Sequence, residues 1–460
     1  MTTALIYTLP FLSGLLLAIG VLWMKRPFFK LAKRSVSLLN TLVSDLDEDE
    51  KFEAVNAQVF KTMGALALVL CMSIVVICFS TAVYTGVFGL VFEKTLSSGI
   101  KMGILAVGSI VPFVIPRKQT SDYSDIAQLF HRLVLDNYHL GKRLLERQIK
   151  NSEVSSHYSG PFSRVLITGL ARSGTTALTK ELEKRGPFAS LDYSNMPVLL
   201  APRLWRKFYR PKQVENKERA HGDGVKVGLA SVEALEEYFF KVLKQDCYIL
   251  ETGLQKHALS EEENALYRKY QNSISGPGKV YLAKNNNAIT RLPSLIKHNP
   301  DLIVFVMLRD PLQHAYSLMK QHQKFLAKQE KDPFVIDYMN WLGHHEFGSN
   351  QRPFLLQEGE AELHLGDPNT LAYWLKRWVS YYTYVQEFET VHLLSYEAYA
   401  HDPVATLHCI AQASFIDLDT TGLAVFSKKD VPMDKAGSTL ETAAHELYLK
   451  LIGQCRNVSL

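Results

Sequence analysis

The sequence predicts an α/β domain of three layers with a mainly parallel sheet, preceded by an α-helical transmembrane region. Long stretches without a charged residue occupy much of the first 120 residues, which indicates membrane-spanning helices. Further along, the apolar runs 165–167 and 302–308 are typical of buried parallel strands. A turn rich in Gly, Ser and Thr directly follows the first of these runs. Strand, glycine-rich turn and helix in succession form an arrangement that binds phosphate at a helix N-terminus.

Three apolar runs make up the predicted membrane region, residues 1–120. Ala4–Met24 carries no charge and is long enough to cross a bilayer core of about 30 Å. Thr62–Phe92 is also free of charge and longer than one span requires. Met102–Pro116 is shorter and contains two prolines, so it is either a third span or a re-entrant segment. We predict about three transmembrane helices.

The basic residues predict the orientation of these spans. A cluster of Lys and Arg between Lys25 and Arg34 follows the first run, and Arg117 and Lys118 follow the third. The positive-inside rule then places residues 25–61 and everything after 117 on the cytoplasmic side of a multi-pass membrane protein. Residues 35–61, which include the acidic cluster Asp45–Glu50, are predicted to be a solvated loop between helices.

Residues 121–160 connect the membrane region to a globular domain at 161–460. Apolar residues recur at roughly helical spacing in Ser121–Lys150, with basic residues on the remaining face. We expect one amphipathic connecting helix there. Asn151–Pro161, rich in Ser and Gly, is interpreted as the linker into the domain.

The turn GLARSGTT, residues 169–176, has the glycine spacing of a Walker loop but not its lysine. Thr175 stands at the lysine position, and the basic residue is Arg172, before the second glycine. An ATP or GTP enzyme with this turn would lack its main γ-phosphate contact. Backbone N–H groups, together with the hydroxyls of Ser173, Thr175 and Thr176, still suit an anion. The domain is therefore predicted to be P-loop-like.

A second candidate anion site follows the run LIVFVML at 302–308. Arg309 stands at the carboxyl end of this strand, the edge where ligands bind in open α/β sheets. Pro311 suits the first turn of a helix, which then carries Ser317 about two turns along. We expect Arg309 and Ser317 to lie on the same edge as the turn at 169–176.

Together these motifs resemble the sulfotransferase family. The sequence Arg172-Ser-Gly-Thr-Thr176 is similar to its 5′-phosphosulfate loop, Arg309 with Ser317 resembles its 3′-phosphate site, and SYEAYAHDPVATL at 395–407 resembles its late Y-E-x-x-x-x-x-P stretch. The resemblance spans Arg164 to about Asp417. It implies a membrane-anchored, bacterial-type enzyme whose donor is 3′-phosphoadenosine 5′-phosphosulfate (PAPS), with no metal required. The residues it implies for PAPS binding are Arg172, Ser173, Gly174, Thr175, Thr176, Arg309 and Ser317.

The predicted catalytic residues are Arg172, Lys284, His221 and Asp223. Lys284 ends a predicted strand, Val280–Lys284, and resembles the lysine that family members place beside the sulfuryl group. The cytosolic branch of the family has a histidine just after that lysine, whereas this chain has three asparagines, 285–287. The base is therefore sought in the tight turn RAHGDG, which holds His221 and Asp223, with Asp192 and Glu233 as weaker candidates.

Two other functions remain open at this stage. The first is a divergent P-loop kinase or other nucleotide-binding membrane enzyme, and the second is a membrane-bound nucleotide sensor without chemistry. The net charge of +5 is small and basic and aromatic residues are not interleaved, so no nucleic-acid partner is predicted. The expected partners are the lipid bilayer and an acceptor hydroxyl or amine on a glycan, lipid-linked sugar or lipid.

Overall fold

The computed structural model describes residues 2–42, 48–82, 100, 103–107, 109, 124–150, 158–209, 217–218, 226–227, 234–357, 366–423, 425 and 438–458. The chain divides into two compact units, Met1–His139 and Leu140–Leu460. Each unit is described by itself below.

The first unit is built on an antiparallel pair of long helices, α1 (Thr2–Leu42) and α2 (Glu48–Ala82). Hydrogen bonds link the pair along its length: Ser80 Oγ to the Ser13 carbonyl at 3.2 Å, and Arg34 Nη1 to the Lys61 carbonyl at 2.7 Å. The prediction of a solvated loop over 35–61 is wrong, because both helices continue through that segment. The register of the pair sets residues 34–41 of α1 against residues 58–61 of α2, since Thr41 Oγ1 also donates to Gln58 Oε1 at 3.1 Å.

Both α1 and α2 are long and apolar enough to cross a membrane, by length and composition. Large apolar side chains on α2 are exposed, among them Leu66, Leu70, Ile74, Val75 and Ile77. A soluble helix would bury such a surface. The third apolar run is described only at 103–107 and 109, where the backbone is helical, so the number of spans stays a prediction.

The described part of the third run packs against α1 at Gly14. Ser109 Oγ donates to the Gly14 carbonyl at 3.3 Å. A Cβ at position 14 would overlap the carbonyl oxygen of Leu105 and lie 3.0 Å from the Ser109 nitrogen. Only glycine allows this approach, as is common where membrane helices meet.

Two helices, not one, occupy 121–150. α5 (Asp125–Leu135) begins at an N-cap, Ser124, and ends at Asp136, and α6 (Tyr138–Lys150) follows. The prediction of a single connecting helix is therefore wrong, because Asp and Asn are weak helix formers that bond to nearby backbone instead. α6 is tied to the second unit, since Gln148 Nε2 donates to Ser273 Oγ at 3.1 Å.

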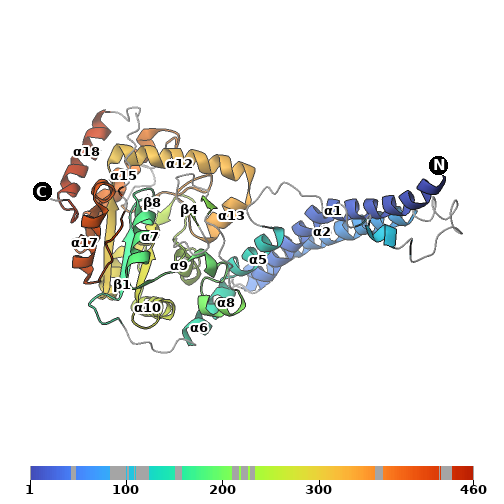
Figure 1. Ribbon diagram of the computed structural model, residues 1–460, viewed down its shortest axis with the longest axis horizontal. Helices are drawn as coiled ribbons and strands as arrows, with labels where there is room; N and C mark the ends of the chain where they lie inside the picture. Colours follow the sequence, from blue (N-terminus) through green and yellow to red (C-terminus); the bar gives the residue numbers. More distant parts are fainter. Residues whose placement is uncertain are drawn as a thin grey trace. The chain divides into compact units, whose positions relative to one another are not determined.

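The second unit is a three-layer α/β domain (Figure 1). Five parallel strands form its sheet in the order β2-β6-β1-β7-β9. Their bounds are β1 Arg164–Thr168, β2 Phe188–Ala189, β6 Val280–Lys284, β7 Leu302–Leu308 and β9 His392–Ser395. Short pairs form between β3 (Lys217–Glu218) and β4 (Lys226–Val227), and between β5 (Leu254–Gln255) and β8 (Phe354–Leu355). The predicted fold class and the strands at 280–284 and 302–308 are confirmed.

Helices cover both faces of this sheet. On one face, α7 (Thr175–Arg185) and α17 (Pro403–Ser414) bury Leu178, Leu182, Leu407 and Ile410 against alternate strand residues. On the opposite face of β6, α9 (Glu237–Lys244) and α10 (Glu261–Ser275) cover Tyr281. The remaining helices are η2 Tyr193–Asn195, α8 Pro202–Phe208, η3 Asn286–Arg291, α11 Leu292–His298, α12 Pro311–Lys331, α13 Phe334–Trp341, α15 Leu371–Val385, α16 Tyr396–His401 and α18 Ser438–Ile452.

The strand order puts β1 in the centre, with β6 and β7 on its two sides. Ile167 pairs with Lys284 of β6, and Thr168 pairs with Val306 of β7. Because all three strands are parallel, their carboxyl ends meet at one edge, and the segments after them lie together there.

A substitution at Gly14 tests the helix packing of the first unit. Gly14→Ala should destabilise it by about 1–3 kcal/mol, the usual cost of overpacking, and lower the melting temperature in detergent micelles. Gly64→Ala on α2 is the matched control, because nothing lies within 4 Å of a Cβ there. An unchanged melting temperature for Gly14→Ala would show that α1 and residues 103–109 are not packed together.

Candidate functional site

The turn after β1 follows a path that its glycines permit. Gly169 and Gly174 have φ of 150° and 99°, and Arg172 also has a positive φ, 71°. A Cβ on Gly174 would lie 2.5 Å from Cδ2 of Tyr396, and one on Gly169 would lie 2.7 Å from Oγ of Ser173. The Ser173 side chain is fully buried beneath the turn. Glycine is needed at both positions for conformation and for space.

The N-terminus of α7 is open to an anion. Its N-cap is Gly174, so no side chain caps the first turn, and that turn contains no acidic residue. The first N–H groups of a helix have no partner within the helix, and the helix dipole favours negative charge beside them. The hydroxyl-bearing residues of this first turn are Thr175 and Thr176.

Arg309 anchors the turn from the end of β7. Its Nη1 donates to the Arg172 carbonyl at 2.9 Å, and its guanidinium carbon lies 4.6 Å from the ring centre of Tyr396. Arg172 reaches α12, where its Nε donates to Ser317 Oγ at 3.3 Å. Burial lowers the pKa of Arg309, and the charge of Arg172 adds to this effect. The structure thus brings Arg172, Arg309 and Ser317 together, with two cations side by side.

His314 on α12 holds the same turn from below. Its Nε2 lies 2.7 Å from the Ala171 carbonyl, so the imidazole is the neutral tautomer that donates from Nε2. Burial, followed by the charge of Arg309, lowers the pKa of His314 to about 3. The histidine is therefore a structural donor to the turn at neutral pH.

Lys284 lies at the same edge, at the end of β6. It is 9% exposed and pairs with Ile167 of β1, and the next residue, Asn285, continues the ladder by donating to the Ile167 carbonyl at 3.1 Å. The structure therefore places Lys284 one strand away from the turn at 169–174. Asn285, Asn286 and Asn287 follow Lys284, where the resemblance led us to expect a histidine.

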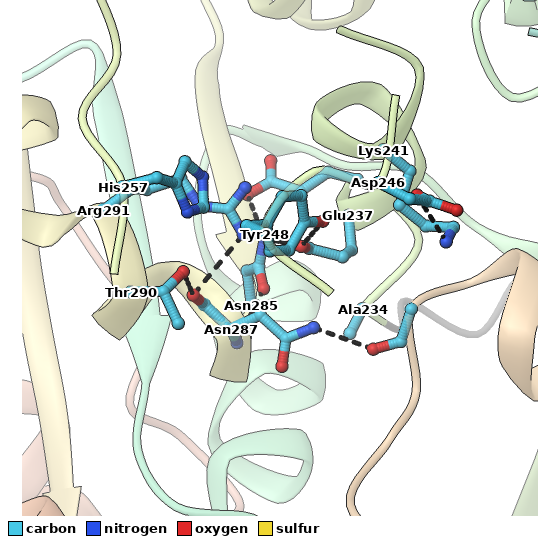
Figure 2. A network of polar contacts seen from close by, with 12 residues as sticks. Ala234, Glu237, Lys241, Asp246, Tyr248, His257, Asn285, Asn287, Thr290 and Arg291 are labelled. Atoms are coloured by element: carbon cyan, nitrogen blue, oxygen red, sulfur yellow. Dashed lines mark hydrogen bonds and ion pairs between the residues drawn. The ribbon is translucent and has the colours of Figure 1, made fainter. Parts of the chain in front are cut away.

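A buried polar network holds the asparagine segment from behind (Figure 2). Asn285 Nδ2 donates to Glu237 Oε2 at 2.9 Å, and Arg291 Nη2 lies 2.6 and 2.7 Å from the two oxygens of the same carboxylate. Tyr248 also donates to Glu237. Burial acts to raise the pKa of Glu237, but attraction to Arg291 and these hydrogen bonds outweigh it and leave the pKa low.

Glu236 is the second buried carboxyl group of this network. Burial raises its pKa to about 7, against hydrogen bonds from tyrosines that include Tyr281, whose hydroxyl lies 3.1 Å away. Two carboxyl groups whose pKa values are shifted in opposite directions thus stand side by side behind β6. The sequence analysis missed both, because the tyrosine and arginine partners are scattered between positions 237 and 291.

Of the predicted base candidates, the structure describes Asp192. His221, Asp223 and Glu233 lie outside the described residues. Asp192 follows β2, but its carboxylate accepts from the backbone nitrogen of Ser194 at 2.8 Å and caps the short helix η2. Asp192 thus has a local structural role.

A histidine that the sequence analysis did not consider lies close to the turn. His345 lines a cavity together with Leu170 and Ala171. Its Nδ1 lies 3.0 Å from the Asn350 carbonyl, and burial lowers its pKa to about 4. A neutral imidazole that donates from Nδ1 keeps a lone pair on Nε2, and Nε2 has no partner among the described residues. No sequence signal marks position 345, because only the tertiary structure brings it to position 170.

Known structures of similar fold are sulfotransferases. No protein-family model and no curated protein matches the sequence. The sulfotransferase STF1 from Mycobacterium tuberculosis H37Rv superposes with a TM-score of 0.37 at 12% identity, over 73% of this chain and 84% of that one. STF9 from Mycobacterium avium gives a TM-score of 0.36 at 13% identity, over 80% and 86%.

A sulfotransferase from Alicyclobacillus acidocaldarius gives a TM-score of 0.31 at 15% identity, over 63% of this chain and 95% of that one. At such low identity and TM-score the likeness does not decide the family by itself, so the case for a function rests on the site.

The buried His314 predicts a loss of stability in acid. Above its ordinary pKa of 6.5 the imidazole is neutral in both states. Below pH 6.5 the unfolded chain binds a proton at this histidine, whereas the folded chain does so only near pH 3. The free energy of unfolding therefore falls by about 1.4 kcal/mol for each unit by which the pH falls in this range. Urea unfolding of His314→Gln should therefore show a shallower decline than the wild type, by about 2 kcal/mol between pH 6.5 and 5.

His401→Gln, an exposed substitution on α16, is the control for this change of residue type. Equal declines in the wild type and in His314→Gln would contradict the neutral, donating histidine.

Proposed function

We propose that this protein is a PAPS-dependent sulfotransferase that transfers a sulfuryl group to a hydroxyl or amine. The observation that carries the proposal is the convergence of the open N-terminus of α7 with Arg172, Arg309 and Ser317. Two cations and a helix N-terminus at one sheet edge suit a donor with phosphate at both its 5′ and 3′ ends.

The residue types favour this donor over ATP. Thr175 replaces the Walker lysine, so the γ-phosphate of ATP would lack its cation. Arg309 supplies instead a second positive group from a different strand. Among the described residues no carboxylate forms an ion pair with Arg309, and a 3′-phosphate would neutralise it. These features support the PAPS proposal against a divergent P-loop kinase.

PAPS supplies the activated sulfuryl group. In the proposed site the N–H groups of α7, the Thr175 and Thr176 residues and Arg172 bind the 5′-phosphosulfate, and Ser173 shapes the turn from beneath. Arg309 and Ser317 bind the 3′-phosphate. Arg172 and Lys284 offset the negative charge that develops on the leaving group, the kind of preorganised electrostatic support that lowers such barriers.

The acceptor is proposed to be a glycan, a lipid-linked sugar or a lipid at the membrane. The helices α1 and α2 support this, because an anchor confines enzyme and acceptor to one surface and raises their effective concentration. We further propose that the protein is multi-pass and that its catalytic domain is cytoplasmic, from the basic residues that follow the first and third apolar runs.

Donor binding tests the function. By calorimetry on the full chain in detergent micelles, adenosine 3′,5′-bisphosphate should bind without Mg²⁺ and far more tightly than ATP. Arg309→Ala should weaken this binding by roughly 2–4 kcal/mol, the scale for removing one side of a buried charge pair.

Arg172→Ala should act more on the turnover of PAPS, because its charge meets the developing negative charge. ATP binding that equals that of the bisphosphate and disappears on chelation of Mg²⁺ would refute the function and favour a kinase.

Two candidate bases can be separated by kinetics. His345 of the described structure and the predicted pair His221 and Asp223 each offer a proton acceptor. Replacing the true base should lower kcat by about 100-fold or more, with little effect on donor affinity. We expect this result for His345→Gln, and smaller effects for His221→Gln and Asp223→Asn. A large loss of kcat in His221→Gln or Asp223→Asn, without one in His345→Gln, would instead assign the base to the turn at 220–224.

A further inference from the structure

A cavity of about 30 Å³ adjoins both parts of the proposed donor site. Its walls include Leu170 and Ala171, which directly precede Arg172, and Leu318, which directly follows Ser317. Helix α15 and the segment 345–354 close the other sides. An acceptor must approach the sulfuryl group from a space beside the turn, and this cavity provides such a space.

Arg377 of α15 brings a buried positive charge to the cavity. The residue is 8% exposed, and its guanidinium carbon lies 4.0 Å from the ring centre of Tyr373 and 5.3 Å from that of Trp374. Its hydrogen-bond partners are neutral: the Tyr373 hydroxyl, and the Gln351 amide oxygen at 3.2 Å in the orientation that satisfies both groups. Burial lowers the pKa of Arg377 to about 10, and no carboxylate among the described residues opposes this shift.

Three residues of the cavity wall carry polar atoms that are buried without a partner. These atoms are Nε of Arg377, Nε of Arg352 and Nε2 of His345, each without a hydrogen bond among the described residues. Folded proteins leave few such groups unsatisfied, because each has lost its water. Their presence around one cavity indicates a ligand that accepts from the two guanidinium groups and donates, through a hydroxyl, to His345.

The acidic residue of the same wall does not supply them. Glu346 also lines the cavity, and its carboxylate accepts from Asn286 Nδ2 at 3.5 Å, near the end of β6. Within the described residues it forms no ion pair with Arg352 or Arg377. The positive charge of the two arginines is therefore left for a bound anion.

We propose that this cavity, whose volume of about 30 Å³ suits one small group, binds a phosphate or carboxylate of the acceptor, next to the hydroxyl that is sulfated. The inference rests on the proposed function and names its substrate class. Arg377 and Arg352 bind the oxyanion with planar forks of N–H donors, which suit phosphate and carboxylate oxygens. Trp374 and Phe354 provide apolar wall beside it. A phospholipid head group and a soluble sugar phosphate present the same chemistry.

The proposed transfer exchanges one oxygen bond to sulfur for another. The acceptor oxygen forms the new bond to sulfur, and the bond between that sulfur and the 5′-phosphate oxygen of PAPS breaks. The hydroxyl proton passes to the base of the site, and adenosine 3′,5′-bisphosphate leaves. The oxyanion of the acceptor stays bound to the arginines and takes no part in the bond changes.

The test compares paired acceptors with the full chain in nanodiscs and radiolabelled PAPS. One pair is glucose 6-phosphate and glucose, and the other is phosphatidylglycerol and neutral monoglucosyl diacylglycerol. We expect the anionic member of one pair to be sulfated with a kcat/KM at least about 10-fold above that of the neutral member, the scale of one charged hydrogen bond. The pair that shows this difference identifies the soluble or the lipid source.

Arg377→Gln should remove the difference in kcat/KM within the pair, because it should lower kcat/KM for the anionic acceptor only. Lys376→Gln, which removes the same charge from the exposed side of α15, should leave it unchanged. The inference is overturned if the neutral members react equally well or if Arg377→Gln lowers both members alike. If Arg377→Gln does not fold, the half-buried Arg352 provides the second variant, Arg352→Gln, with the same expectation.

A binding measurement covers the case in which no tested acceptor reacts. With the donor site saturated by adenosine 3′,5′-bisphosphate, glycerol phosphate should raise the melting temperature of the wild type and not of Arg352→Gln. No shift in the wild type overturns the inference. Calorimetry of the donor is independent of these results: failed donor binding refutes the proposed function, whereas intact donor binding with a neutral acceptor refutes the inference alone.

Discussion

The anchoring of one turn to three other elements is the constraint on which the site depends. Two successive carbonyls of the turn are bound from inside the domain, that of Ala171 by His314 of α12 and that of Arg172 by Arg309, which directly follows β7. Gly174 meanwhile packs against Tyr396 of α16. With its carbonyls held toward the protein, the turn leaves the amide end of α7 free. The anchoring also maintains the positive φ of Arg172, a conformation that a non-glycine residue does not adopt without support.

The position of Lys284, at the end of β6, depends on a buried ion pair. Glu237 and Arg291 form an ion pair with 1% and 0% of their side chains exposed, and such a pair is tolerated only when hydrogen bonds complete it. Tyr248 and Asn285 donate two of these bonds, and the ring of Phe240 lies 3.9 Å from the guanidinium carbon. Because Asn285 directly follows Lys284, the network that completes the Glu237 carboxylate also fixes the end of β6.

Structural contacts explain two of the asparagines that follow Lys284. Asn285 and Asn287 have structural partners: Asn285 binds Glu237, and Asn287 donates from Nδ2 to the Gly343 carbonyl at 2.8 Å. Gly343 lies two residues before His345, so the same contact ties the cavity wall to β6.

Local sequence determined the elements that have a strong local cause. Continuous apolar runs predicted β6 and β7 with their observed bounds, since only a strand buried on both faces tolerates such a run. The glycine spacing and the position of Arg309 after β7 predicted the shared edge, because parallel strands bring their carboxyl ends together. The prediction was wrong at 35–61, where α1 extends to residue 42 and α2 begins at residue 48, and at 121–150, where a single weak Asp-Asn step divides the helix.

Only the tertiary structure decided which polar side chains meet. Glu237 is separated from Arg291, and Leu170 from His345 and Arg377, by long stretches of chain, and no periodicity links such positions. Their proximity follows from the packing of helices on both faces of the sheet and from the return of segment 345–354 to the turn. The sequence by itself determined the turn after β1, since its backbone path needs glycine at two fixed places. The acceptor side depends on long-range burial, which a local pattern does not record.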